Sequence, residues 1–182
     1  MTWSTHALLG ISTRWLLAPL PPELIGYDLG TLATIAALGA LLPDLDASNS
    51  KIKHLKLLGT RFKPFLLPSY IIHRSDRHRG LLHSLLGLSM VAGVAVPPIW
   101  WAGWAGWAPV VALLLGYASH LLADAATKTG IAFLFPSRKR FHALPVGLRV
   151  TTDSQAEEVL FALAVAVVFL LLLRYSAISY SV

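Results

Sequence analysis

His120 and Asp124 form the residue pair in this sequence that is best placed to do chemistry. They stand four residues apart at the end of an apolar run, so on a helix they lie one turn apart on the same face. An imidazole and a carboxylate placed in this way can bind one metal ion, or can serve as a base and the group that orients it. A structural hydrogen-bonded pair is the alternative. Because ionisable groups within membrane segments usually serve a function, we favour the metal or catalytic interpretation.

The composition is that of an integral membrane protein. The chain has 182 residues, of which 55% are hydrophobic and 13% are charged, and its mean hydropathy is +0.64. Soluble domains carry about 25% charged residues, so this chain is too apolar for water. Its length suits a single domain over residues 1–182. The sequence contains no cysteine, which leaves His, Asp and Glu as the possible metal ligands.

Five apolar segments predict an all-α bundle of about five short membrane-embedded helices. They cover residues 5–18, 29–42, 85–101, 108–123 and 159–173. The last extends to about residue 180 if the side chain of Arg174 reaches the membrane surface. The first two end at prolines, which cannot continue a helix. Since 14 helical residues measure only about 21 Å, the first segment is either a short span or a half-buried helix.

Two basic loops, residues 47–79 and 127–149, predict the topology. Loops rich in Lys and Arg face the cytoplasm, so we expect a multi-pass protein of the inner (cytoplasmic) membrane with both loops on the cytoplasmic side. If the first segment also crosses, five segment ends reach that side, and each brings polar residues. We expect these residues to meet in one cytoplasm-facing metal site; they are His6, Asp44, Asp46, His78, His83, His120, Asp124 and Glu157.

Such a set of ligands favours zinc or a similar divalent ion. Its size exceeds one tetrahedral site, so two or three ions are possible. Metal clusters of this kind activate water and hold the oxygens of a phosphoester, and a site at the membrane surface implies a phospholipid or lipid-linked substrate. In this interpretation Asp44 or Asp46 is the base, and Arg79 or Arg138 stabilises charge in the transition state. The residues expected to contact a substrate phosphate are Arg79, Lys128, Arg138 and Arg140.

Other interpretations stay open for several of these residues. Asp44 and Asp46 follow a proline and can simply form a turn, and His142 is undecided. His54 and His73 lie in the first basic loop, and we interpret them as solvated residues. The basic loops are typical of topology signals and lipid-headgroup contacts rather than of a nucleic-acid surface.

Two other classes of function compete with the hydrolase. One is a non-enzymatic membrane protein that binds metal or anionic lipid in a structural or regulatory role. The other is a divalent-metal carrier, which is disfavoured because carriers place their ligands near the bilayer midplane. The sequence alone selects neither the substrate headgroup and the bond cut, nor the number and identity of the metals, nor the oligomeric state.

The ordered motifs resemble a known family. They are Leu42–Asp46, His78–Ser84, Gly116–Asp124 and Phe135–Pro136 followed by Arg138 and Arg140. Over about residues 5–158 the chain is similar to the bacterial LexA-regulated inner-membrane metal-dependent hydrolases. That family is held to be distantly similar to zinc-dependent phospholipase C, a helical enzyme with a three-zinc site, which implies phospholipase C-like phosphoester hydrolysis. The ligands that the resemblance implies are His6, Asp44, His83, His120, Asp124 and Glu157, with Asp46 and His78 as ligands or as partners of ligands.

The chain departs from that pattern at two places. Leu82 stands where the family often has Thr, which removes a hydroxyl that can orient a ligand. In the soluble phospholipases a free N-terminal amine binds metal, and we expect no counterpart here because Met1 lies five residues before His6. This departure predicts a cluster with fewer metal ions.

Overall fold

The computed structural model describes residues 1–21, 25–46, 56–57, 60–61, 80–103, 106–137 and 139–179. These residues form five α-helices: α1 (Trp3–Ser12), α3 (Leu29–Leu41), α5 (Leu85–Trp101), α6 (Trp107–Ala125) and α7 (Gln155–Ser179). The 3-10 helices are η1 (Thr13–Leu16), η2 (Pro43–Asp46), η4 (Leu81–His83) and η5 (Val146–Leu148). The two-residue strands β1 (Lys56–Leu57) and β2 (Thr60–Arg61) pair antiparallel. The predicted all-helical class is confirmed.

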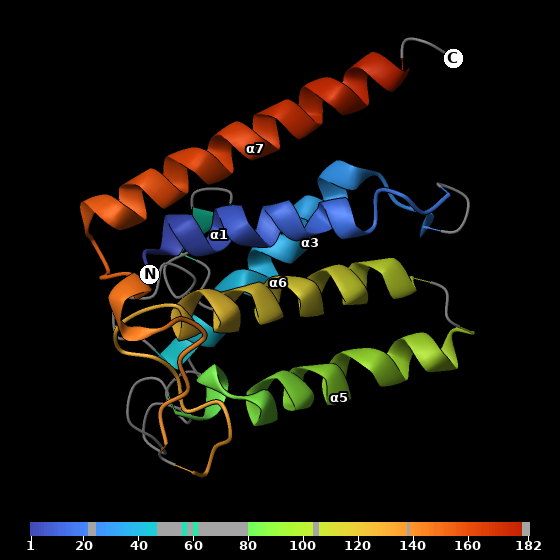
Figure 1. Cartoon of the computed structure of the whole chain (residues 1–182). Helices are drawn as coiled ribbons and strands as arrows, with labels where there is room; N and C mark the ends of the chain where they lie inside the picture. The colour runs from blue at the N-terminus through green and yellow to red at the C-terminus, as the bar shows by residue number, and fades with distance from the viewer. Residues whose placement is uncertain are drawn as a thin grey trace.

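The helices lie roughly alongside one another, and one end of the bundle holds the N-terminus together with the connection from α6 to α7. Figure 1 shows α1, α6 and α5 side by side, with α3 behind them and α7 leaning away along the outer side of α1. The N-terminus, the start of α5, the end of α6 and the start of α7 all lie at the left end of this view. The segment 126–154, which joins α6 to α7, covers the same end.

Local signals in the sequence set the helix ends. Asp28 caps α3 by accepting a hydrogen bond from the Thr31 amide at 2.9 Å, and Ser84 caps α5 by accepting from the Gly87 amide at 3.2 Å. Pro43 follows α3 at once and starts the next turn. The predicted bounds of α3 and α5 therefore match the structure closely. The first helix differs, because its N-cap is Thr2 and its last turn tightens into η1.

Glycine and alanine let α3 pack closely against α1 and α6. A Cβ added at Gly116 would lie 1.9 Å from the Ala36 carbonyl oxygen, and one added at Gly39 would lie 2.1 Å from the Leu113 carbonyl oxygen. Gly10 of α1 approaches Ala36 and Ala40 in the same way. Small residues at helix contacts are typical of helix packing in membranes, where close backbone approach maximises van der Waals contact. This packing fixes the relative positions of the three helices that carry the site.

Two helices of the described chain are long and apolar enough to cross a membrane. They are α6 and the first 19 residues of α7. Half of the apolar stretch of α6 is buried in the protein, whereas almost none of that of α7 is buried. The helices α3 and α5 have 13 and 17 residues, which correspond to about 20 Å and 26 Å. The predicted number of helices, five, thus matches the described residues. Among these residues, only α6 and α7 are long and apolar enough to cross a membrane completely.

Gly116→Ala should destabilise the bundle. The new methyl group would collide with the backbone of α3, so one helix must shift, at a cost of about 1–3 kcal/mol. We expect a lower melting temperature than the parent protein in detergent, measured by circular dichroism. Gly93→Ala is the matched control, since it also adds a methyl group inside a helix but meets nothing within 4 Å. Equal melting temperatures for the two variants would contradict the packing described above.

Candidate metal centre

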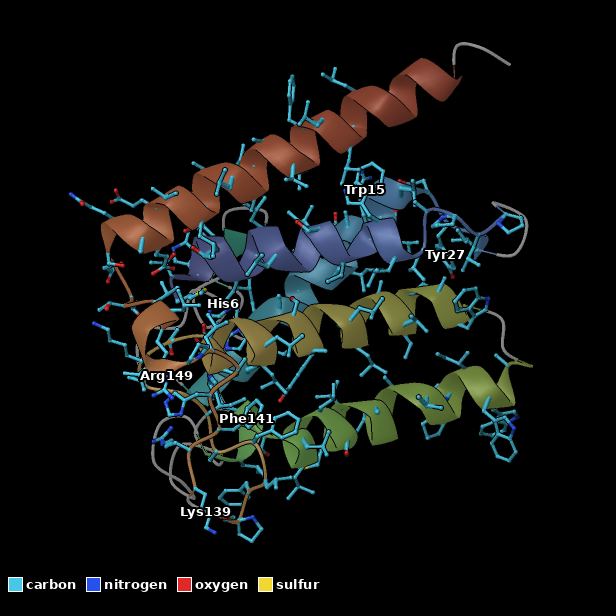
Figure 2. The ribbon with its side chains drawn as sticks, viewed as in Figure 1. His6, Trp15, Tyr27, Lys139, Phe141 and Arg149 are labelled. Atoms are coloured by element: carbon cyan, nitrogen blue, oxygen red, sulfur yellow. The ribbon has the colours of Figure 1, made fainter. Side chains whose placement is uncertain are left out.

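Five polar side chains from four segments meet at the end of the bundle where the N-terminus lies. They are His6 of α1, Asp44 of η2, His83 of η4, and His120 and Asp124 of α6. Figure 2 shows His6 at this end, where α1 faces α6. His120 and Asp124 share a face of α6 because they are one helical turn apart. His83 is held in the short turn between Gly80 and the cap residue Ser84. We call these five residues the His–Asp cluster.

The distances in the His–Asp cluster define two overlapping groups of possible ligands. His6, His120 and Asp124 form one group, and Asp44, His83 and His120 form the other, each with ligand atoms within 4.8 Å of one another. The Nε2 atoms of His120 and His83 lie 3.2 Å apart. His83 Nε2 is 3.6 Å from Asp44 Oδ1, and His6 Nε2 is 3.3 Å from Asp124 Oδ1. His120 belongs to both groups and is the centre of the arrangement.

A backbone contact fixes the tautomer of His120. Its Nδ1 lies 2.6 Å from the carbonyl oxygen of Ala40, in the last turn of α3. A carbonyl oxygen can only accept, so Nδ1 carries a proton and the neutral ring presents a lone pair at Nε2. That lone pair faces His83 Nε2 at 3.2 Å. Either His83 donates an Nε2–H to this lone pair, or both nitrogens present lone pairs and a cation lies between them. Histidine ligands of metals commonly donate their second N–H to a backbone carbonyl in this way.

The remaining members of the cluster also fit a divalent cation. The side chains of His6, His83, His120 and Asp124 are 0–1% exposed. The rings of His6 and His120 stack with their centroids 3.7 Å apart, and His6 Nδ1 is buried with no hydrogen-bond partner among the described residues. Buried carboxylates need a compensating charge, and imidazole and carboxylate donors without sulfur suit zinc and similar ions. The residues present therefore fit a metal site.

Asp44 lies where the cluster opens. Its side chain is 25% exposed, in contrast to the other four members. Burial alone would raise the pKa of the Asp44 carboxyl, but the hydrogen bond with His83 and the attraction of the surrounding imidazoles lower this pKa to about 2. Asp44 is therefore ionised at neutral pH, which is the form that binds a cation.

The N-terminus lies at the cluster, contrary to the sequence-based expectation. The α-ammonium group of Met1 is buried and donates to Asp124 Oδ1 at 2.8 Å. The expectation was wrong because it considered only the spacing between Met1 and His6: the residues before α1 run extended and turn the amine back toward α6. In its neutral form an α-amine has a lone pair that can bind a metal ion, and the number of ions stays a prediction.

Glu157 holds this N-terminal segment in place. One carboxylate oxygen accepts from the Thr2 amide at 2.6 Å and from the Thr2 hydroxyl at 3.0 Å, and the other accepts from the Asp153 amide at 2.9 Å. Glu157 is thus next to the cluster but belongs to neither ligand group of the described residues. Its contacts indicate a tether between the starts of α1 and α7.

Among the described residues, no contact joins the other predicted site residues to the His–Asp cluster. His78, Arg79 and Arg138, and the side chain of Asp46, lie outside the described residues, as do His54 and His73. Lys128 and Arg140 are exposed in the segment after α6. His142 Nε2 contacts the Lys128 carbonyl oxygen at 3.2 Å, outside the cluster. The roles of these residues stay predictions.

Sequence reasoning missed three supporting contacts. Tyr117 donates to the Leu82 carbonyl oxygen at 2.5 Å and so supports the turn that carries His83. The spacing of Tyr117 and His120 on one helical face was a signal for this contact. The Ala40 carbonyl and the Met1 amine carry no such signal, because backbone groups are the same at every residue.

Fold and cluster together define a small helical membrane protein with a buried His–Asp centre. The chain belongs to the YdjM inner membrane protein family, which matches residues 1–180. It is 36% identical over 151 residues to "Inner membrane protein YdjM" of Escherichia coli (strain K12), covering 80% of this chain and 70% of that protein. It is 33% identical over 162 residues to "Uncharacterized protein YvsG" of Bacillus subtilis (strain 168), covering 89% and 88%. No solved structure gives a significant match.

The family name and the name of the Escherichia coli relative support the membrane and inner-membrane predictions. None of these names states an activity. In a membrane, the exposed apolar side chains of α7, among them Val167, Phe169 and Leu170, can face lipid.

Removing one ring from the cluster should weaken metal binding. We expect His83→Ala and His120→Ala to bind Zn²⁺ about tenfold to hundredfold more weakly than the parent protein, or not at all. The measurement is metal content and titration calorimetry on purified protein whose helical content has been checked. His142→Ala is the control, since it removes an imidazole outside the cluster. Unchanged affinity in the first two variants would show that the rings form only a hydrogen-bonded core.

Proposed function

We propose that this protein is a membrane-bound metal-dependent hydrolase that cleaves a phosphoester of a phospholipid or lipid-linked substrate. The observation that carries the proposal is the buried pair of Nε2 atoms of His83 and His120, which lie 3.2 Å apart beside the carboxylates of Asp44 and Asp124 and can bind a cation together with them. Asp44 Oδ1 lies 3.6 Å and Asp124 Oδ2 3.7 Å from His83 Nε2. The proposal is in line with the resemblance to LexA-regulated metal-dependent hydrolases and, more distantly, to zinc-dependent phospholipase C.

The five residues of the His–Asp cluster would hold the divalent ions. Zinc or a similar ion bound there would act as a Lewis acid that activates water and neutralises phosphoryl oxygens. Asp124 and the three histidines are buried and serve to bind and orient. Asp44 is both in the cluster and partly exposed, so it is the group best placed to meet a substrate.

The remaining steps use residues near the opening. Asp44 or Asp46, the two carboxylates of η2, would accept the proton of the attacking water. Arg79 or Arg138 would stabilise the charge that develops on the phosphoryl oxygens, and Lys128 and Arg140 would attract the substrate phosphate. The basic segments would face the cytoplasm, which places the site beside the inner leaflet.

A structural metal site is the second candidate. Four of the five side chains are almost fully buried, and closed coordination is typical of structural zinc. This candidate predicts that metal removal lowers stability and that the metal-loaded protein has no turnover. The partial exposure of Asp44 favours the hydrolase, because a catalytic ion needs an open position.

Zinc-loaded protein in lipid nanodiscs should hydrolyse at least one member of a panel of phospholipids and lipid-linked phosphoesters. The measurement is mass spectrometry of the released headgroup or phosphate. Asp44→Asn should lower turnover by about two orders of magnitude or more, because it removes charge from the open side of the site. His142→Ala should retain activity. Removing the metal with a chelator should abolish the activity of the parent protein, and adding zinc back should restore it.

The hydrolase proposal fails if folded, metal-loaded protein cleaves no phosphoester in the panel. It also fails if Asp44→Asn leaves turnover unchanged. Lower thermal stability after chelation, without any turnover, would instead assign the metal a structural role.

A further inference from the structure

The segment between α6 and α7 exposes large aliphatic side chains outside any helix that could span a membrane. Leu134 is 66% exposed, Val146 75% and Leu148 67%. These fractions are as high as those of α7, where Leu163 is 62% exposed and Leu170 63%. We call Leu134, Val146 and Leu148 the loop apolar patch. Exposed aliphatic side chains outside a membrane-spanning helix can mark a contact surface.

Backbone contacts hold the patch residues outward. Ile131 and Phe141 exchange hydrogen bonds of 3.1 Å and 2.8 Å between their amides and carbonyls, and Ile131 is fully buried. The Val150 amide donates to the Ala126 carbonyl at 3.1 Å, which ties the end of the segment to the end of α6. Val146 and Leu148 lie in η5, closed by the Leu148 amide and the Pro145 carbonyl at 2.9 Å. The patch side chains are therefore exposed on a loop whose backbone is held by hydrogen bonds.

The charge of the segment identifies what can cover the patch. Residues 126–150 contain five basic residues and no Asp or Glu; the basic residues are Lys128, Arg138, Lys139, Arg140 and Arg149. Lys139 and Arg140 are exposed. A surface that combines aliphatic side chains with an excess of positive charge complements an anionic bilayer surface, which offers acyl chains and phosphate headgroups together. Nucleic acid offers phosphates but gives the aliphatic side chains no apolar environment.

The position of the segment agrees with this partner. It leaves the end of α6 and leads into α7, so it lies at one end of both helices that can cross the membrane. Figure 1 shows it at the same end as the N-terminus. Figure 2 shows Lys139 and Arg149 of this segment at the margin of the molecule. A loop at the end of two spans lies at the depth of the headgroups.

We propose that residues 131–149 lie in the interface of the adjacent leaflet, with the loop apolar patch inserted among the upper acyl chains and the basic side chains bound to anionic headgroups. This contact would hold the end of the bundle that carries the His–Asp cluster at headgroup depth. It does not depend on the hydrolase proposal, because it concerns only how the loop meets lipid.

The absence of native cysteine allows a direct test by site-directed spin labelling. Leu134→Cys, Val146→Cys and Leu148→Cys are labelled one at a time in nanodiscs that hold one copy of the protein, with phosphatidylcholine alone or mixed with phosphatidylglycerol. Accessibility to oxygen and to a water-soluble nickel complex gives the depth of each label. Val167→Cys in α7 is the lipid-exposed reference, and Thr152→Cys, an exposed polar position before α7, is the shallow reference.

We expect the three patch labels to be several-fold less accessible to the nickel complex than the label at Thr152, and to lie deeper when phosphatidylglycerol is present. Accessibility equal to that at Thr152 would overturn the proposal. Equal depth in both lipid mixtures would overturn the anionic part of it. Protection only in vesicles that hold many copies, but not in single-copy nanodiscs, would assign the patch to a second copy and overturn the lipid contact.

Discussion

The hydrogen bond from His120 to the Ala40 carbonyl is the contact on which the site depends. It fixes the proton on Nδ1 and turns the lone pair of Nε2 toward His83. It can form only because α3 and α6 approach at backbone distance, and that approach is possible only because Gly39 and Gly116 have no side chain. The tautomer of His120 therefore depends directly on the close packing of α3 against α6. Moving α6 outward by the width of a methyl group would loosen both.

Burial keeps water away from the charged and polar groups of the His–Asp cluster. Water could otherwise hydrate the carboxylates of Asp44 and Asp124 and separate the rings, but the cluster is almost closed except at Asp44. In such a setting each charge must be met by a partner from the protein or by a bound cation. The Met1 amine and the Glu157 tether are part of the same closure, since they bring the start of the chain against Asp124. Contacts from the starts of α1 and α7 thus help to close the site.

Sequence reasoning succeeded where a signal is local. The apolar runs and their proline and cap residues placed α3 and α5 almost to the residue, and the i, i+4 spacing placed His120 and Asp124 on one face. The expectation that segment ends would gather at one end was sufficient to group His6, Asp44 and His83 with them. It was insufficient for Lys128 and Arg140, because a loop of 29 residues (126–154) has no periodicity that fixes where its side chains point.

The sequence by itself determined the class of the protein and the chemical types at its centre: an apolar, cysteine-free helical chain whose His and Asp residues fall at segment ends. Only the tertiary structure decided which atoms face one another. The Nε2 pair, the Ala40 acceptor, the buried Met1 amine and the tethering contacts of Glu157 all join residues distant in sequence, or use backbone groups that every residue has. Such contacts are set by how closely the helices pack, and residue types alone do not encode those distances.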